Sequence, residues 1–69
     1  MDLMTTAEVA EYLNVKETTL RWWRHVGETG PRSFRLGAKK VMYKRADVDA
    51  WVMQQINAER DDEDKLVSL

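Results

Sequence analysis

Nine basic residues lie between positions 16 and 45, and they are the side chains of this sequence with the clearest chemical capability. Two acidic residues, Glu17 and Glu28, share that stretch, so its net charge is +7. The basic residues are Lys16, Arg21, Arg24, Arg32, Arg35, Lys39, Lys40, Lys44 and Arg45. Lysine and arginine neutralise phosphate groups and release the counterions that surround a nucleic acid. The stretch therefore has the chemistry of a phosphate-binding surface.

The segments on either side of this basic stretch have the opposite charge. Residues 1–15 have a net charge of −3 and residues 46–69 have −5, which brings the 69-residue chain to −1. A total near zero would argue against nucleic-acid binding, but charge that is separated by segment is interpreted segment by segment. We expect one side of the protein to face DNA and the back and tail to repel it.

Two helices separated by a tight turn are predicted over residues 5–26. Thr5 and Glu8 have the spacing of a capping box, in which each side chain accepts a hydrogen bond from the other residue's backbone N–H. Apolar residues follow at helical spacing, at Val9, Ala10, Tyr12 and Leu13. Asn14 tolerates the left-handed backbone conformation, so the first helix is expected to end there in a turn.

The second helix is expected over residues 16–25, and its two faces differ in chemistry. Leu20 and Trp23 are predicted to point inward, with Val26 closing this apolar stripe. Trp22 cannot share that side, so it is expected to be partly exposed, against the following hairpin or the edge of the DNA backbone. The outer face is polar, basic and aromatic, and it consists of Thr18, Arg21, Trp22 and His25.

A small β-hairpin, here called the wing, is predicted over residues 33–44. Strand-forming runs at residues 34–36 and 41–43 flank a tip that contains Lys39 and Lys40. The preceding residues include two glycines and the one proline of the sequence, which favour a loop. The wing therefore presents basic side chains next to the second helix.

A final helix is predicted over residues 45–56, which would complete a domain over residues 1–56. Its apolar stripe consists of Val48, Trp51, Val52 and Ile56. Four consecutive acidic residues follow at positions 61–64. A run of like charges suits a frayed helix end or a solvated tail better than a packed element, so residues 57–69 are predicted to form an acidic C-terminal tail.

Length and composition exclude several classes of protein. A domain of this size has a modest core and no room for a deep substrate cavity. The chain has no cysteine and one histidine, His25, so neither a zinc-thiolate site nor a nucleophile with its base can be assembled. No apolar run is long enough to span a bilayer, and the start does not resemble a signal peptide. We expect an intracellular protein that is not an enzyme and uses no cofactor, metal or small-molecule substrate.

The order helix, turn, helix, hairpin, helix predicts a mainly α fold with a small β-hairpin, a compact winged helix-turn-helix. In a helix-turn-helix the second helix enters the major groove of DNA, so basic and hydrogen-bonding residues should concentrate on it. A basic hairpin beside that helix can reach neighbouring phosphates or the minor groove. The predicted DNA-binding residues are Lys16, Thr18, Arg21, Trp22, Arg24, His25, Arg35, Lys39 and Lys40.

Residues 4–52 resemble the helix-turn-helix domain that is shared by phage excisionases, or recombination directionality factors, and small relatives of the mercury-resistance-regulator (MerR-like) superfamily. The matching segments are residues 5–13 (TTAEVAEYL), Val15 with residues 19–24 (TLRWWR), residues 30–37 (GPRSFRLG) and residues 43–51 (YKRADVDAW). Asn14 stands where this family more usually has glycine. Full-length regulators of the mercury-resistance type continue into a long dimerising coiled coil, so the short chain favours the excisionase-like branch.

The resemblance implies an excisionase that binds and bends DNA and directs a phage integrase toward excisive site-specific recombination. The implied partners are double-stranded DNA of the attachment-site arms, the integrase and neighbouring copies of the protein, with no membrane. The implied location is the cytoplasm of a bacterial host, with the nucleoid. Two alternatives stay open, namely a small helix-turn-helix transcriptional regulator and a protein-interaction adaptor that uses the acidic tail.

Overall fold

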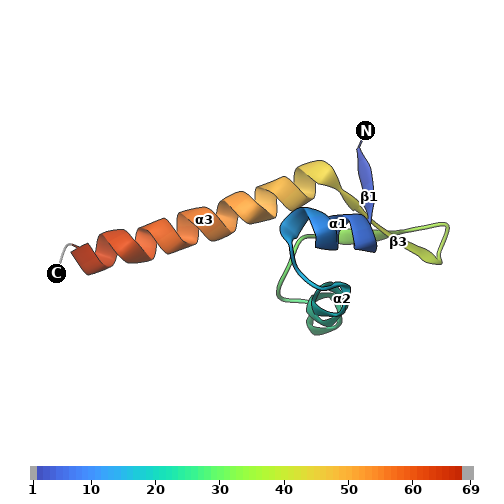
Figure 1. Cartoon of the computed structure of the whole chain (residues 1–69), viewed down its shortest axis with the longest axis horizontal. Helices are drawn as coiled ribbons and strands as arrows, with labels where there is room; N and C mark the ends of the chain where they lie inside the picture. Colours follow the sequence, from blue (N-terminus) through green and yellow to red (C-terminus); the bar gives the residue numbers. More distant parts are fainter. Residues whose placement is uncertain (1, 68–69) are drawn as a thin grey trace.

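The computed structural model describes the backbone of residues 2–67 and the side chains of residues 2–60. In chain order its elements are β1 (Leu3–Thr5), α1 (Thr6–Leu13), α2 (Glu17–Val26), β2 (Ser33–Leu36), β3 (Lys40–Lys44) and α3 (Arg45–Val67). Figure 1 shows α1 and α2 close to the sheet, the β2–β3 hairpin at one end, and α3 extending from the opposite end as a long rod. The predicted winged helix-turn-helix, mainly α with a small β-hairpin, is confirmed.

The start of α1 is fixed by the predicted capping box. The Thr5 hydroxyl accepts a hydrogen bond from the Glu8 backbone N–H at 3.1 Å, and the Glu8 carboxylate accepts one from the Thr5 backbone N–H at 2.9 Å. The hydrogen bond from the Thr5 backbone N–H is the main cause that lowers the pKa of Glu8 below 4.5, and the Thr5 side chain and the positive charge of Lys40 lower it further. Thr5 also pairs with Met42 of β3, so the start of α1 lies beside the wing.

The turn between α1 and α2 has the geometry expected for its asparagine. Asn14 is left-handed, with φ 59° and ψ 42°, and its backbone N–H bonds back to the end of α1. Val15 N–H then donates to the Ala10 carbonyl at 2.9 Å, so the chain reverses within a few residues. Lys16 is the N-cap residue of α2. The predicted tight turn is confirmed.

The sheet contains one strand that the sequence pattern did not indicate. β3 lies in the middle, with β1 and β2 antiparallel on either side of it, so the wing is the two-stranded part of a three-stranded sheet. β1 was missed because its three residues are too few to show the alternation that identifies a strand. It forms because the free edge of β3 supplies hydrogen-bond partners, and it leads directly into α1.

The core lies between the sheet and the three helices. Its buried side chains come from α1, α2, β3 and α3, and they are Val9, Ala10, Leu20, Tyr43 and Val48. Trp23 is half-buried against this cluster. Val26 was expected to extend the inward stripe, but it is 43% exposed because the chain leaves α2 at Gly27 and turns toward β2.

α3 is longer than predicted. Residues 45–56 were expected to be the whole helix, but the helix continues to Val67 through part of the expected tail. After residue 44 the sequence contains neither glycine nor proline, so no residue that strongly breaks a helix interrupts it. The side chains of the acidic run at 61–64 lie outside the described residues. Across the described part of the chain, every helix is too short or too polar to cross a membrane.

Tyr43 provides a test of the core. Its side chain is fully buried, and among the described residues its hydroxyl has no hydrogen-bond partner. A buried polar group without a partner costs about 1–3 kcal/mol. We expect Tyr43→Phe to leave the free energy of unfolding unchanged or raise it by about 1 kcal/mol in urea denaturation. A loss of stability of that size would mean that the hydroxyl is hydrogen-bonded in solution.

Candidate nucleic-acid interface

The outer face of α2 is exposed, and its inner face is anchored at two points. Leu20 is 1% exposed within the core, and the Trp23 ring packs against Trp51 of α3 with centroids 5.3 Å apart and planes at 49°. The outer side chains are exposed at Lys16, Thr18, Arg21, Trp22 and His25, as the sequence predicted. The helix thus presents one set of side chains to solvent while its inner face packs on the core and on α3.

Arg21 is more exposed than Arg24, the other arginine of α2. Its Nη2 lies 3.3 Å from Glu17 Oε2, one helical turn earlier, and both side chains are largely exposed. An exposed ion pair of this kind contributes about 0–1 kcal/mol. The guanidinium has further N–H donors, so the pair orients Arg21 without preventing contact with another acceptor.

Arg24 differs from the other basic residues of α2. Its Nη1 donates a hydrogen bond to the Thr6 hydroxyl at 2.9 Å, and the contact is partly buried. This bond joins the last turn of α2 to the first turn of α1. Arg24 therefore has a positioning role in the helix-turn-helix that the sequence did not reveal, because residue spacing along α2 does not show its distance from Thr6.

Trp22 and His25 form an aromatic pair on the outer face. Their ring centroids are 6.0 Å apart and the planes are tilted by 32°. Trp22 is 61% exposed. Trp22 was expected either to pack on the wing or to lie at the edge of the DNA backbone. Most of its side chain faces solvent, so it does not pack extensively on the wing.

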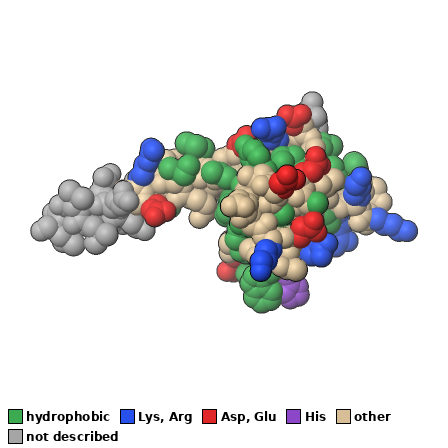
Figure 2. Space-filling model, viewed as in Figure 1, with side chains coloured by type: hydrophobic (Ala, Val, Ile, Leu, Met, Phe, Trp, Pro, Cys, Tyr) green, Lys and Arg blue, Asp and Glu red, His purple; other side chains and the backbone are tan. Residues whose placement is uncertain are grey.

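The wing presents the second basic group. Arg35, Lys39 and Lys40 are exposed, and the β2–β3 register places Leu36 opposite Lys40 at the tip. Gly37 and Ala38 in the turn both have positive φ, at 64° and 68°. Figure 2 shows Lys and Arg side chains at the hairpin end of the molecule, and acidic side chains over the region of α1. Basic side chains therefore gather at the hairpin end, while both signs of charge occur over the rest of this face.

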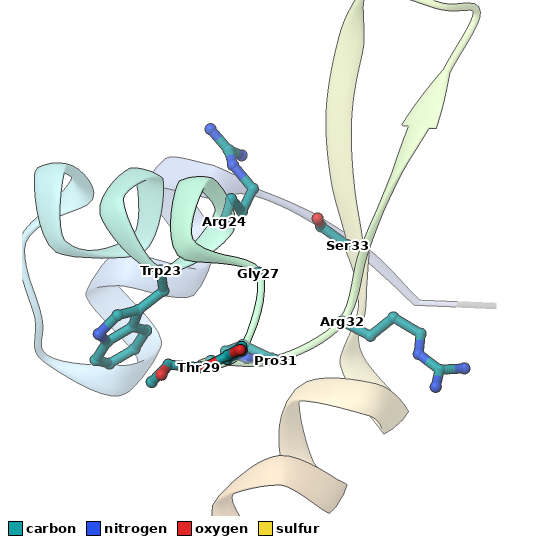
Figure 3. Close-up of a pocket in the computed structure, with 9 residues that line it drawn as sticks. Trp23, Arg24, Gly27, Thr29, Pro31, Arg32 and Ser33 are labelled. Carbon is teal, nitrogen blue, oxygen red and sulfur yellow. The ribbon is translucent and has the colours of Figure 1, made fainter.

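A polar cavity of about 300 Å³ separates α2 from β2. Figure 3 shows Arg24 at one side of it and Arg32 at the other, with both guanidinium groups pointing away from the opening. Arg32 is exposed between the two predicted contact elements, although it was not among the predicted site residues. The sequence feature that could have identified Arg32 as a site residue was its place in the basic stretch of residues 16–45. Among the described side chains, no group of three metal-ligating residues is assembled.

Residues 3–56 match the family described as helix-turn-helix domain. The chain belongs to this family. A comparison with curated proteins and a comparison with solved structures each found no match. Family membership supports DNA binding, with α2 as the second helix of the motif, the one that enters the major groove in helix-turn-helix proteins. The exposed outer face of α2 is the part of this domain that is suitable for that contact.

The loop between α2 and the wing gives a test of how the two contact elements are held. A Cβ atom at Gly30 would lie 2.8 Å from the Trp23 ring, whereas one at Gly27 would meet no atom within 4 Å, although both residues have a similar positive φ. We expect Gly27→Ala to cost about 1–2 kcal/mol from backbone strain. Gly30→Ala should cost about 1–3 kcal/mol more because Trp23 must move. Urea denaturation of both variants measures the difference, and equal losses would show that the contact with Trp23 contributes nothing.

Proposed function

We propose that this helix-turn-helix domain is an excisionase, a protein that binds and bends DNA and thereby directs a phage integrase toward excision. The observation that supports it most is the combination on one small body of an exposed outer face on α2 with an exposed basic wing. Two contact elements on one rigid support suit a protein that acts by shaping DNA. The resemblance of residues 4–52 to excisionases selects this role among those open to the family.

In this proposal α2 provides the sequence-specific contacts. Arg21 donates to base edges in the major groove, where arginine most often pairs with guanine. Thr18 or His25 supplies a second polar contact, and Trp22 lies beside them on the same exposed face. Lys16 neutralises a phosphate at the N-terminus of the helix. Arg24, held by Thr6, uses its remaining donors toward the sugar-phosphate backbone.

The wing provides contacts that do not depend on sequence. Arg35, Lys39 and Lys40 bind phosphates or the narrow minor groove and stabilise the bent DNA. Bending a short site costs about 1–6 kcal/mol. Phosphate contacts and adjacent copies of the protein on repeated attachment-arm sites offset that cost, so binding is expected to be cooperative.

The protein makes and breaks no covalent bond in this mechanism. Bond chemistry belongs to the integrase, and the excisionase acts by positioning the DNA arms so that the excisive complex assembles and the integrative complex does not. The proposed site of action is the bacterial cytoplasm, on the nucleoid or phage DNA. A small helix-turn-helix regulator would use the same α2 and wing at a promoter, so the two roles differ in target and partner.

The two contact elements should respond differently to mutation. Arg21→Ala is expected to weaken binding to the preferred site by about 1–3 kcal/mol and to relax sequence preference. Lys39→Ala should weaken binding to all sequences similarly and reduce the magnitude of the salt slope by about 1. Fluorescence anisotropy against specific and random duplexes at several salt concentrations measures both effects. The opposite pattern would mean that the roles of α2 and the wing are exchanged.

Salt dependence distinguishes DNA binding from a role as a protein adaptor. If about five phosphates are neutralised, the logarithm of affinity falls with the logarithm of salt concentration at a slope of about −4 to −5. An adaptor that uses the acidic tail and no DNA would show no such binding to a duplex. The absence of any salt-sensitive DNA binding would contradict the proposal at its first step.

An excision assay tests the excisionase role itself. A plasmid that carries the two prophage attachment sites, incubated with the integrase that acts on those sites, should recombine excisively only when the protein is added. Integrative recombination on matched substrates should decrease under the same conditions. Tight binding to the protein's own promoter without any stimulation of excision would instead support a transcriptional regulator.

A further inference from the structure

Trp22 is the most exposed of the large hydrophobic side chains that the structure describes. It is 61% exposed, compared with 52% for Met53 of α3 and 49% for Leu36 of the wing. The neighbouring Trp23 packs against Trp51, so Trp23 and not Trp22 supplies the aromatic packing between α2 and α3. Trp22 therefore contributes little to folding, and its large apolar surface is available for contact with another molecule.

The position of Trp22 places that surface among the side chains proposed to face base edges. It follows Arg21 directly and precedes His25 by one turn of the same helix, on the exposed face of α2. The ring of His25 lies beside the indole at 6.0 Å. Figure 2 shows a hydrophobic side chain and the histidine together at the outer edge of the molecule, away from α3. Contact with His25 restricts the indole before DNA binds.

The major groove offers one apolar group to such a ring, the C5-methyl of thymine. Apart from the small C5–H of cytosine, the other base-edge groups there are mainly hydrogen-bond donors or acceptors, and covering them with an indole face removes their water without replacing the hydrogen bonds. Burial against a methyl group instead removes apolar surface on both sides from water. The chemistry of the groove thus favours thymine opposite Trp22.

We propose that Trp22 is a specificity-determining residue that selects thymine at one position of the binding site by packing against its C5-methyl group, with His25 orienting the ring. This inference rests on the proposed DNA-binding role of α2. It adds an apolar contact to a face otherwise expected to recognise DNA by hydrogen bonds and charge. The contact is uncharged, so its contribution to affinity changes little with salt concentration.

Replacement of thymine by deoxyuridine tests the proposal, because it removes the methyl group and leaves the base pair intact. A preferred site is first selected from a random duplex library with the full chain, and each thymine in it is then replaced singly. Loss of one buried methyl is expected to weaken binding of the unmodified protein about threefold to tenfold at one position. A cytosine placed at that position should bind more tightly when it is 5-methylated.

Variants identify the side chain that contacts the methyl. In Trp22→Ala the ratio of dissociation constants for the deoxyuridine and thymine duplexes should fall to about one, while Trp22→Phe retains part of the effect. Met53→Ala is the matched control, since it removes another exposed apolar side chain from a different helix and should keep the full ratio. Circular dichroism and urea denaturation verify that each variant folds, as expected for exposed positions.

The outcomes separate this inference from the proposed function. If the selected site binds specifically but every deoxyuridine is tolerated, or Trp22→Ala keeps the ratio of the unmodified protein, the thymine contact is wrong while DNA binding stands. If Trp22→Ala weakens binding to all sequences alike, Trp22 contacts the sugar-phosphate backbone and the inference is again wrong. If no site is enriched from the library, both the inference and sequence-specific binding by α2 are contradicted.

Discussion

The packing of Trp23 is the constraint on which the arrangement of the contact surface depends. This side chain leaves the inner face of α2, packs on Trp51 of α3, and lies directly under the backbone of Gly30. The Trp23 indole thus connects α2, to which it belongs, with the final helix and with the loop that leads to the wing. Because the core has few buried side chains, a large ring at this junction determines the spacing between α2 and the wing to an unusual degree.

Short polar contacts complete what the small core begins. The capping box joins the end of β1 to the start of α1, and the hydrogen bond from Arg24 to Thr6 ties α2 to that same turn. On the other side of α1, the Tyr12 hydroxyl donates to Asp49 of α3 at 2.6 Å, and Arg45 lies 5.1 Å from the centre of the Tyr12 ring. Each helix is therefore fixed to another by a directional contact as well as by apolar burial.

These contacts hold the domain together without using the outer face of α2 or the tip of the wing, whose side chains are exposed. Arg21 makes a weak exposed ion pair with Glu17, the Trp22 ring lies beside His25, and Lys39 follows two turn residues in left-handed conformation. A domain of this size can hold two exposed elements at a fixed separation. That property suits the recognition of DNA, a ligand larger than the protein.

The sequence by itself determined the elements whose causes are local. The capping box at Thr5, the left-handed turn at Asn14, the division of α2 into two faces and the basic hairpin all follow from neighbouring residues. The net charge of −1 conceals the basic stretch, but the separation of charge by segment was visible in the order of residues. These features are predictable because hydrogen bonds and side-chain periodicity act over a few positions.

Only the tertiary structure decided the features that depend on distant partners. β1 exists because β3 offers it an edge, Arg24 is tied to Thr6 because α1 and α2 cross there, and Val26 is exposed because the chain turns away after Gly27. α3 continues beyond its apolar stripe, and no glycine or proline interrupts the chain where the amphipathic pattern stops. Spacing along a chain does not show which residues contact one another across the fold. Those contacts determine which side chains stabilise the domain and which remain available for binding.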